Sequence, residues 1–339
     1  MCSRPIPTLP GANAPGSRDQ AIVDTGSGQP EAATTATATD LAERRADRLA
    51  TLPLTPAGPR SGFVAGTAQS IRDIVAYREL LDLLVRRELK ARYKDSVLGF
   101  FWSLMFPLAQ LLIYYVALGK FLGAERAIPD YAIFVFTGLT TWQLFTEIVG
   151  GGTGSVVANG ALVKKIYLPR EVFPLSVVGS ALFNFTIQLV ILVLATFVVG
   201  KPPTGVELVY APLALFVVVI YASALAFLLS AVNVYLRDVQ YLVQIALMVL
   251  FWTAPIVYSW TQVHKVLRDG IAAKIYLGNP LTQATLAFQH CFWVAGRPGS
   301  SFPAGTGRNL GLTMAVGLLF LWLCQRVFAR LQDNFAQEL

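Results

Sequence analysis

The chain has 339 residues, of which 55% are apolar and only 14% are charged, and its mean hydropathy is +0.55. Soluble domains carry about 25% charged residues, so this composition excludes an ordinary soluble globular protein and favours a chain whose solvent is a lipid bilayer. The net charge is +7. In a membrane protein such an excess gathers at the cytoplasmic ends of the spans, so we do not expect binding to nucleic acid.

The first part of the chain, residues 1–69, differs from the rest in composition. Residues 1–60 are rich in Ala, Thr, Pro and Gly and lack the apolar core of a signal peptide. A short charged patch lies at residues 41–50. This composition predicts a disordered cytoplasmic tail, which is either a passive extension or a regulatory segment.

Residues 70–95 predict an amphipathic helix that lies on the cytoplasmic membrane surface. One side of this helix would carry Tyr77, Leu80, Leu81, Leu84 and Val85. The other side would carry Arg86, Arg87, Lys90 and Lys94. A basic amphipathic helix beside a span sits in the headgroup layer, where anionic lipids attract it. An ordinary solvated helix is the alternative.

Six apolar segments follow, each near the roughly 20 residues needed to cross a bilayer. We expect spans near residues 97–122, 131–149, 172–199, 208–232, 241–258 and 310–328. Pro107 interrupts the first, where a kink is tolerated if neighbours satisfy the freed carbonyl. The second would end at the glycine run 150–152, because glycine loosens or ends a helix.

Lysine and arginine concentrate on the loops at one end of these spans, which predicts that this end and both termini are cytoplasmic. The long loop 259–309 is then external. It holds two apolar segments, 275–277 and 281–294, which Asn279-Pro280 separates and which are too short to span. They predict a re-entrant helix pair, with a folded external cap as the alternative.

The cytoplasmic loop 155–171 is too charged for a span and too apolar for a free loop. It predicts a short helix with Leu162, Val163 and Ile166 on one side, which is the form of a helix that fills a groove on a partner protein. The alternative is a positively charged loop that only sets the membrane topology.

Aromatic side chains are dense in the predicted spans. Aromatic faces can stack on the C–H faces of sugars without demanding one hydroxyl pattern, although lipid-facing packing and interfacial belts are the alternatives. The spans hold few polar side chains, and those that stand out are Gln110, Glu147, Asn184 and Gln188. Such groups face a bundle interior or a transport pathway, or they join helices by hydrogen bonds.

Several motifs are absent from the sequence. It contains no G-x-x-x-x-G-K-[ST] phosphate loop, so a pump built on this chain requires a second polypeptide that hydrolyses ATP. It also contains no D-x-D pair, no HExxH and no Cys/His cluster, and its three cysteines lie far apart. We therefore expect no metal, no disulfide and no catalytic residue on this chain.

Residues 92–102 read Arg-Tyr-Lys-Asp-Ser-Val-Leu-Gly-Phe-Phe-Trp. This segment resembles the Arg-Tyr-Lys-x-Ser-x-Leu-Gly-x-x-Trp signature of the permease subunits of type-2 ABC exporters for polysaccharides, which include the O-antigen and teichoic-acid exporters. The loop 155–171 is similar to the coupling segment of that family, Asn-x-x-Leu-Val-Lys-Lys followed by a Pro-Arg turn. The resemblance extends over residues 70–339.

The resemblance implies an all-α membrane protein with the type-2 ABC exporter fold: six transmembrane helices, an N-terminal interfacial helix and an external re-entrant helix pair. It implies a subunit of an ATP-driven exporter that moves a lipid-linked polysaccharide across the plasma (inner) membrane. The Ala/Thr/Pro-rich tail resembles an actinobacterial extension, which makes a cell-wall galactan the candidate substrate. The alternatives are a membrane-embedded enzyme of lipid-linked glycan metabolism and a transporter or channel that needs no ATPase.

The resemblance also implies partners and site residues. The partners are a second copy of this chain, two ABC ATPase subunits that hold ATP and Mg, the lipid-linked polysaccharide and membrane lipids. The ATPase-coupling residues would be Asn159, Leu162, Val163, Lys164, Lys165 and Arg170. Residues that receive a lipid diphosphate would be Arg86, Arg87, Arg92, Tyr93 and Lys94. The channel lining would include Tyr114, Trp142, Phe145, Phe183 and Trp252.

Overall fold

A computed structural model describes residues 63–93, 99–165, 168–268, 270–297, 302–303 and 305–339. These residues all belong to one unit of the chain, Gly58–Leu339. The predicted tail therefore lies almost wholly outside the described residues. The same holds for Lys94, for Ile166 and for the side chains of Arg92 and Tyr93.

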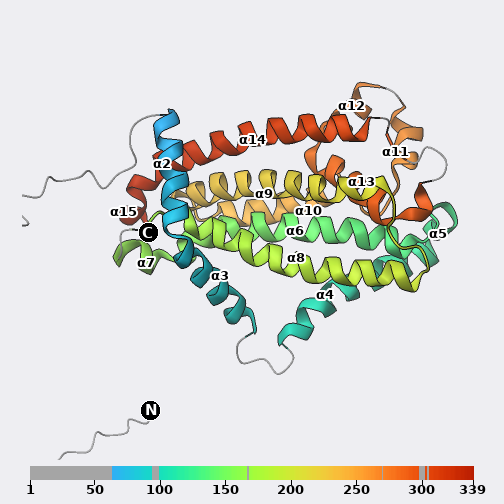
Figure 1. The fold of residues 1–339 in the computed structure, drawn as a ribbon, viewed down its shortest axis with the longest axis horizontal. Coiled ribbons are helices and arrows are strands. Elements are labelled where there is room, and N and C mark those ends of the chain that lie inside the picture. The colour runs from blue at the N-terminus through green and yellow to red at the C-terminus, as the bar shows by residue number, and fades with distance from the viewer. Residues whose placement is uncertain (1–62, 94–98, 166–167, 269, 298–301, 304) are drawn as a thin grey trace, which may run out of the picture. The chain divides into compact units, whose positions relative to one another are not determined.

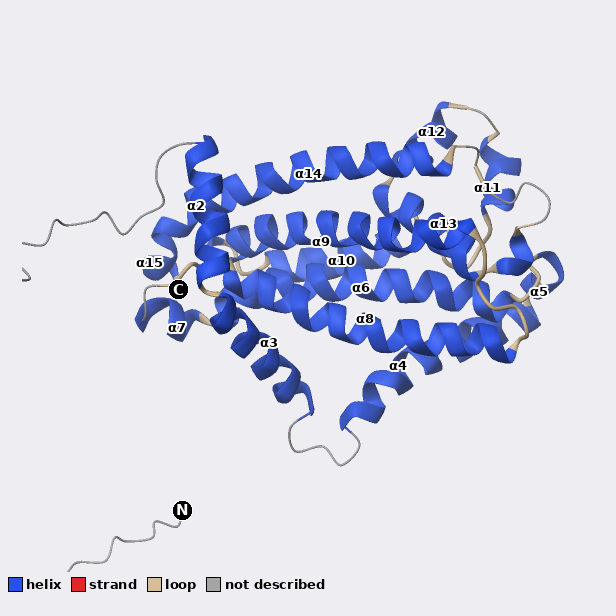
Figure 2. Cartoon of the chain, in the orientation of Figure 1, coloured by secondary structure: helices blue, strands red, loops and turns tan. Residues whose placement is uncertain are grey.

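Every secondary-structure element in the described part of the chain is a helix, which confirms the predicted all-α class (Figure 2). The longer helices are α2 (Phe63–Ala76), α3 (Arg78–Tyr93), α4 (Gly99–Tyr114), α6 (Tyr131–Ala158), α8 (Val172–Val198), α9 (Tyr210–Tyr235), α10 (Val239–Phe251), α13 (Pro280–Phe292) and α14 (Thr306–Leu331). The shorter ones are the π-helix η1 (Tyr115–Phe121), α5 (Ala124–Ala127), α7 (Gly160–Lys165), the 3-10 turns η2 (Val206–Val209), η3 (Val294–Gly296) and η4 (Gln332–Asn334), α11 (Trp260–Leu267), α12 (Ile271–Gly278) and α15 (Phe335–Glu338).

Four long helices lie side by side in the order α14, α9, α6 and α8 (Figure 1). Helix α6 is the most deeply buried of the four. In its most apolar 18-residue stretch 78% is buried, compared with 22% for the corresponding stretch of α14. Helices α7 and α15 lie at one end of this row, and α5, α11 and α12 lie at the other end. We call the end with α7 the α7 end, and the opposite end, toward which α13 also lies, the α13 end.

The helices α6, α8, α9 and α14 are long and apolar enough to cross a membrane, in agreement with four of the six predicted spans. The first and fifth predicted spans are shorter apolar helices, Met105–Phe121 and Val239–Phe251. The fifth ends seven residues before the predicted boundary of 258 because Pro255 cannot continue a helix. Side chains of α13 satisfy the freed backbone there: Gln289 Nε2 donates to the Pro255 carbonyl at 2.6 Å.

The glycine run 150–152 does not end α6, which continues to Ala158, so the predicted boundary at residue 149 was wrong. The run is instead a site of close helix contact. A Cβ atom built on Gly152 would lie 2.5 Å from Ala226 Cβ on α9, and one on Gly151 would lie 2.9 Å from Val177 Cγ1 on α8. Small residues at such contacts let helix backbones approach closely in a membrane.

The predicted helix over residues 70–95 is two helices, α2 and α3, which meet at Tyr77. The apolar side of α3 packs on α8 of the same chain: Leu84 is buried, and a Cβ atom built on Gly179 would lie 2.7 Å from Val85 Cγ2. That these helices lie on a membrane surface stays a prediction.

The predicted break at Asn279-Pro280 is confirmed. Asn279 begins α13, because its Oδ1 accepts a hydrogen bond from the Leu281 backbone N–H at 3.0 Å, and Pro280 occupies the first helical position. Helix α13 is buried and packs between α6, α9 and α14, whereas much of α12 is exposed. Of the two predicted re-entrant helices, α13 is thus inserted between the long helices, whereas α12 lies on the surface.

Candidate functional site

An aromatic cavity of about 340 Å³ lies where α4, α6 and α10 meet. Its lining consists of Gln110, Tyr114, Trp142, Thr146, Gln244, Leu247, Met248, Phe251 and Trp252. Apolar and aromatic walls with a few hydrogen-bonding groups are typical of ligand sites.

Phe251 organises the aromatic side chains of this cavity. Its ring stacks on Tyr114 with centroids 5.7 Å apart, meets the edge of Trp142 at 5.5 Å, and meets Trp252 at 5.4 Å. Local structure places both α4 and α10 residues here: Tyr114 ends the regular part of α4, where the π-helix η1 begins, and Phe251 is the last residue of α10. Such aromatic contacts favour a fixed wall.

The structure brings together three of the five residues predicted to line a channel, namely Tyr114, Trp142 and Trp252. Phe145 is buried beside Trp142, with ring centroids 6.0 Å apart, and supports the wall from behind. Phe183 does not join them: it lies on α8, is 46% exposed, and α8 contributes no residue to this cavity.

The predicted channel lining did not include Gln244, Leu247, Met248 or Phe251, although these residues share one side of α10. Their spacing of three, four and seven residues is the signal that could have identified this face of α10.

The predicted coupling residues form a second candidate site, in and around helix α7. Asn159 lies between α6 and α7; its Nδ2 donates to the Ser155 carbonyl at 2.8 Å, and its Oδ1 accepts a hydrogen bond from Arg87 of α3. The basic side of α3 therefore meets the α7 segment, a contact that the sequence analysis did not predict.

The apolar side of α7 is covered by its own chain. Val163 is buried in a cluster that we call the α7-end cluster, and Leu162 packs against it. The buried members of this cluster are Leu84, Val156, Val163, Val172, Phe173, Phe227, Ala231, Val234, Phe328 and Phe335. The surface that α7 leaves open consists chiefly of Ala161, Lys164 and Lys165. An ATPase that docks here would thus meet the lysines before the apolar side chains.

Two further basic residues lie near α7. Arg170 is half-buried, with its guanidinium carbon 5.6 Å from the centroid of the Phe335 ring. Arg86 on α3 is exposed and pairs with Asp82 at 2.8 Å, an exposed i,i+4 pair that contributes little to stability. Lys90 is also exposed on α3.

A buried carboxyl group at the start of α8 joins three helices. Gln325 Nε2 donates to Glu171 Oε1 at 2.6 Å and to Ser70 Oγ of α2 at 3.0 Å, and Arg326 Nη2 reaches Ser70 Oγ at 3.3 Å. Burial raises the pKa of Glu171, although hydrogen bonds from Gln325 and Ser70 and the charge of Arg326 oppose this. This network could not be predicted from the sequence, since its members are up to 256 residues apart.

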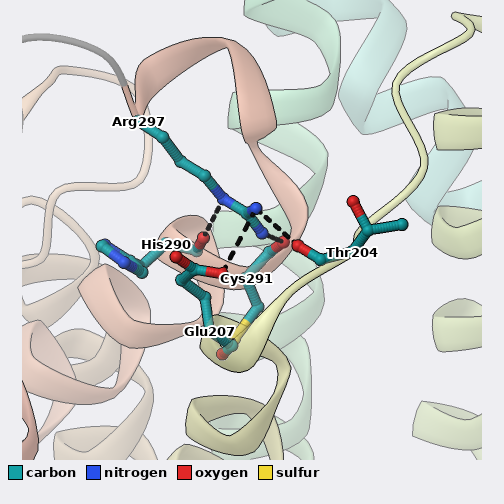
Figure 3. A network of polar contacts seen from close by, with 5 residues as sticks. All are labelled: Thr204, Glu207, His290, Cys291 and Arg297. Carbon is teal, nitrogen blue, oxygen red and sulfur yellow. Dashed lines mark hydrogen bonds and ion pairs between the residues drawn. The ribbon is translucent and has the colours of Figure 1, made fainter.

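The α13 end holds a network around Arg297 (Figure 3). Arg297 donates to the carbonyls of His290 at 3.1 Å, Cys291 at 2.8 Å and Thr204 at 2.7 Å, and it pairs with Glu207 at 3.5 Å. The guanidinium thus caps the last carbonyls of α13 and ties them to the α8–α9 connection. Within the described ranges, no group of three His, Cys, Asp or Glu side chains is placed to hold a metal ion.

Several known proteins are similar to this chain. The O-antigen export system permease protein RfbA of Myxococcus xanthus is 30% identical over 270 residues, which are 79% of this chain and 98% of that protein. A protein of the same description from Klebsiella pneumoniae is 31% identical over 63% of this chain and 80% of its own length. The polysialic acid transport protein KpsM of Escherichia coli is 28% identical over 35% of this chain and 45% of its own length.

The family model described as ABC-2 type transporter matches residues 79–293, from the start of α3 to the end of α13. This range includes the aromatic cavity, α7 and all but one of the helices long enough to span a membrane. The helical architecture, the family match over more than half of the sequence and the near-complete alignment with a curated permease together show that this integral membrane protein belongs to the ABC-2 type transporter family.

Proposed function

We propose that this chain is the permease subunit of an ATP-driven exporter that moves a lipid-linked polysaccharide from the cytoplasm across the plasma membrane. The observation that carries the proposal is the aromatic cavity between α4, α6 and α10. Tyr114, Trp142 and Trp252 offer ring faces to sugar C–H faces, while Gln110 and Gln244 offer hydrogen bonds to hydroxyl groups. The relatives, an O-antigen export permease and a polysialic acid transport protein, support a glycan as the cargo.

The energy would come from ABC ATPase subunits that bind ATP and Mg and dock on the α7 end, with two copies of the permease forming the pore. The exposed lysines of α7 and the Arg87–Asn159 contact support this surface, because a push on α7 would reach α3 directly. We place the α7 end in the cytoplasm because its loops carry the basic residues that the positive-inside rule requires.

The basic side of α3 would receive the diphosphate of the lipid carrier. Arg86 and Lys90 are exposed there, and guanidinium and ammonium groups stabilise phosphate. We extend this role to Arg92, Tyr93 and Lys94 by their place in the sequence. We propose a cell-wall galactan as the polymer by analogy alone, because residues 1–69 resemble an actinobacterial extension.

Reconstitution tests the proposal. The chain and its ATPase partner are placed in proteoliposomes, and ATP-dependent transfer of lipid-linked galactan is measured against the chain alone. We expect transfer only with both proteins and ATP, and no ATP hydrolysis by the chain alone. Transfer without an ATPase would instead establish a channel or secondary transporter, and chemical conversion of the glycan would establish an enzyme.

A further inference from the structure

A second cavity, of about 120 Å³, lies nearer the start of α4 than the aromatic cavity, where α4 meets α6 and α8. Unlike the aromatic cavity, it is lined mainly by carboxyl and carboxamide groups. The lining residues used below are Phe106, Gln143, Glu147, Asn184 and Gln188, and we call this the Glu147 pocket. We infer that the Glu147 pocket binds the hydroxyl edge of a sugar residue of the cargo; the nature of the cargo rests on the proposed function.

The polar side chains of the pocket lie near the middle of long apolar helices, where placing them costs free energy. Glu147 lies near the middle of α6, which runs from residue 131 to 158, and Asn184 lies near the middle of α8, which runs from 172 to 198. Ionisable and amide side chains at such a depth are unfavourable in lipid and are retained where they line a pathway or meet a polar partner.

Two of the polar side chains that line the pocket are hydrogen-bonded to each other. Asn184 Nδ2 donates to Glu147 Oε1 at 2.6 Å, which joins α6 and α8 and holds the carboxyl group in place. Asn184 therefore has a structural task that does not require a ligand.

Gln188 has no such task. Its side chain is 6% exposed and lines the pocket, and the described residues provide no hydrogen-bond partner for it. Gln143, which is half-buried on α6, is in the same situation. Neither carboxamide is among the fully buried polar groups of the described residues that lack a partner, so both open into the pocket, where water or a polar ligand can form their hydrogen bonds.

The chemistry of the lining selects the ligand. A carboxylate accepts hydrogen bonds from hydroxyl groups, and each carboxamide both donates and accepts, so these groups match the edge of a sugar ring. Phe106 is 64% exposed beside them and offers an apolar face to the sugar C–H groups. The cavity volume corresponds to roughly four water molecules, which suits a few hydroxyl groups. The residues that line the pocket include no lysine or arginine, and Glu147 would repel a phosphate, so the lipid diphosphate is not the ligand.

Matched variants separate binding from structure. In Gln188→Leu, export of the lipid-linked glycan should fall about fivefold, the loss expected for one or two hydrogen bonds. The midpoint of thermal unfolding should stay the same or rise, because the amide has no partner in the chain. Asn184→Leu serves as the contrast and should lower both export and the unfolding midpoint, since it breaks the bond to Glu147. Normal export by Gln188→Leu would overturn the inference, as would a loss of export that only follows a loss of folding.

A binding experiment tests the ligand without the ATPase. A cysteine introduced as Gln188→Cys is labelled with a small thiol reagent in nanodiscs, and labelling is counted above that of the parent chain, whose Cys291 and Cys324 are buried. A short galacto-oligosaccharide should slow labelling, whereas a polyprenyl phosphate without sugar should not. Protection by the polyprenyl phosphate alone, or by neither probe, would contradict a sugar site.

The two experiments also separate this inference from the proposed function. If the wild-type chain with its ATPase exports no glycan, the proposed function fails, while protection of the cysteine by the oligosaccharide would still support the pocket. If the wild type exports glycan and Gln188→Leu does so equally well, only the Glu147 pocket is dismissed.

Discussion

The two ends of the helix row are held together by different kinds of hydrogen bond. At the α13 end, side chains mostly bind backbone carbonyls: Arg297 binds three, Gln289 binds Pro255 and Trp293 binds Pro129 at 2.6 Å. At the α7 end, side chains also bind other side chains on separate helices, as in the Arg87–Asn159 and Glu171–Gln325 pairs, beside bonds to carbonyls such as that from the Tyr235 hydroxyl to Leu331 at 2.8 Å.

This difference has a physical consequence. Where a helix is interrupted within a membrane, its free backbone carbonyl and N–H groups need hydrogen-bond partners. Breaking the bond from a side chain that supplies such a partner is therefore costly. Bonds between side chains of neighbouring helices can be exchanged while each helix keeps its own backbone bonds. We therefore expect the α7 end to shift more readily than the α13 end, as the proposed docking of an ATPase there requires.

The largest expected effect comes from Phe335→Ala at the α7 end. Phe335 is fully buried against Phe328, Tyr235 and Arg170, so its removal leaves a cavity in the α7-end cluster. We expect a loss of about 3 kcal/mol in unfolding free energy, with faster hydrogen exchange in α7 than in α13. Phe335→Leu is the control and should retain most of the stability. Equal loosening of both ends would remove the distinction between them.

Arg297→Ala should test the fixed character of the α13 end. The change leaves the carbonyls of His290, Cys291 and Thr204 without their donor, so we expect a loss of about 2 kcal/mol in stability. Arg297→Lys should recover only part of it, since an ammonium group cannot reach all three carbonyls together. Thermal unfolding in detergent measures both variants. An unchanged unfolding midpoint would show that this network does not hold the α13 end.

The double variant Lys164→Glu, Lys165→Glu should alter docking and spare the fold. Both side chains are exposed, so the unfolding midpoint should not move. Binding of the ATPase partner should weaken by about tenfold, which corresponds to 1.4 kcal/mol. Lys164→Arg with Lys165→Arg retains the charge and serves as the matched control. Wild-type affinity in the glutamate variant would leave these lysines with a topological role alone.

The smallest expected effect concerns pH and Glu171. Its folded pKa is raised by burial above the ordinary value of 4.5, so the folded state binds the proton more tightly than the unfolded state. This contribution to stability is present below pH 4.5 and is lost as the pH rises through the raised folded pKa. Glu171→Gln should therefore flatten the pH dependence of the unfolding midpoint. The same slope in both proteins would assign the pH dependence to other groups.

Local sequence determined much of the architecture. Apolar runs of sufficient length become helices in lipid because each helix satisfies its own backbone, and this does not depend on neighbours. The order of the long helices was predictable for this reason, whereas the break at Asn279-Pro280 follows from the Asn cap and the proline at the first helical position. The signature at residues 92–102 and the coupling segment also indicated the family that the comparisons show.

Only the tertiary structure decided how side chains of different helices meet. Trp142 and Phe183 look equivalent in the sequence, yet the position of α10 brings Trp142 into the aromatic cavity and α8 leaves Phe183 exposed. The glycines 150–152 continue α6 because close contact with α8 and α9 favours a helix there over a break. Val163 is buried because α6 and α15 pack against α7, within a cluster to which α3, α8, α9 and α14 also contribute. A linear pattern specifies the face of one helix, but the partner of that face depends on segments up to hundreds of residues away.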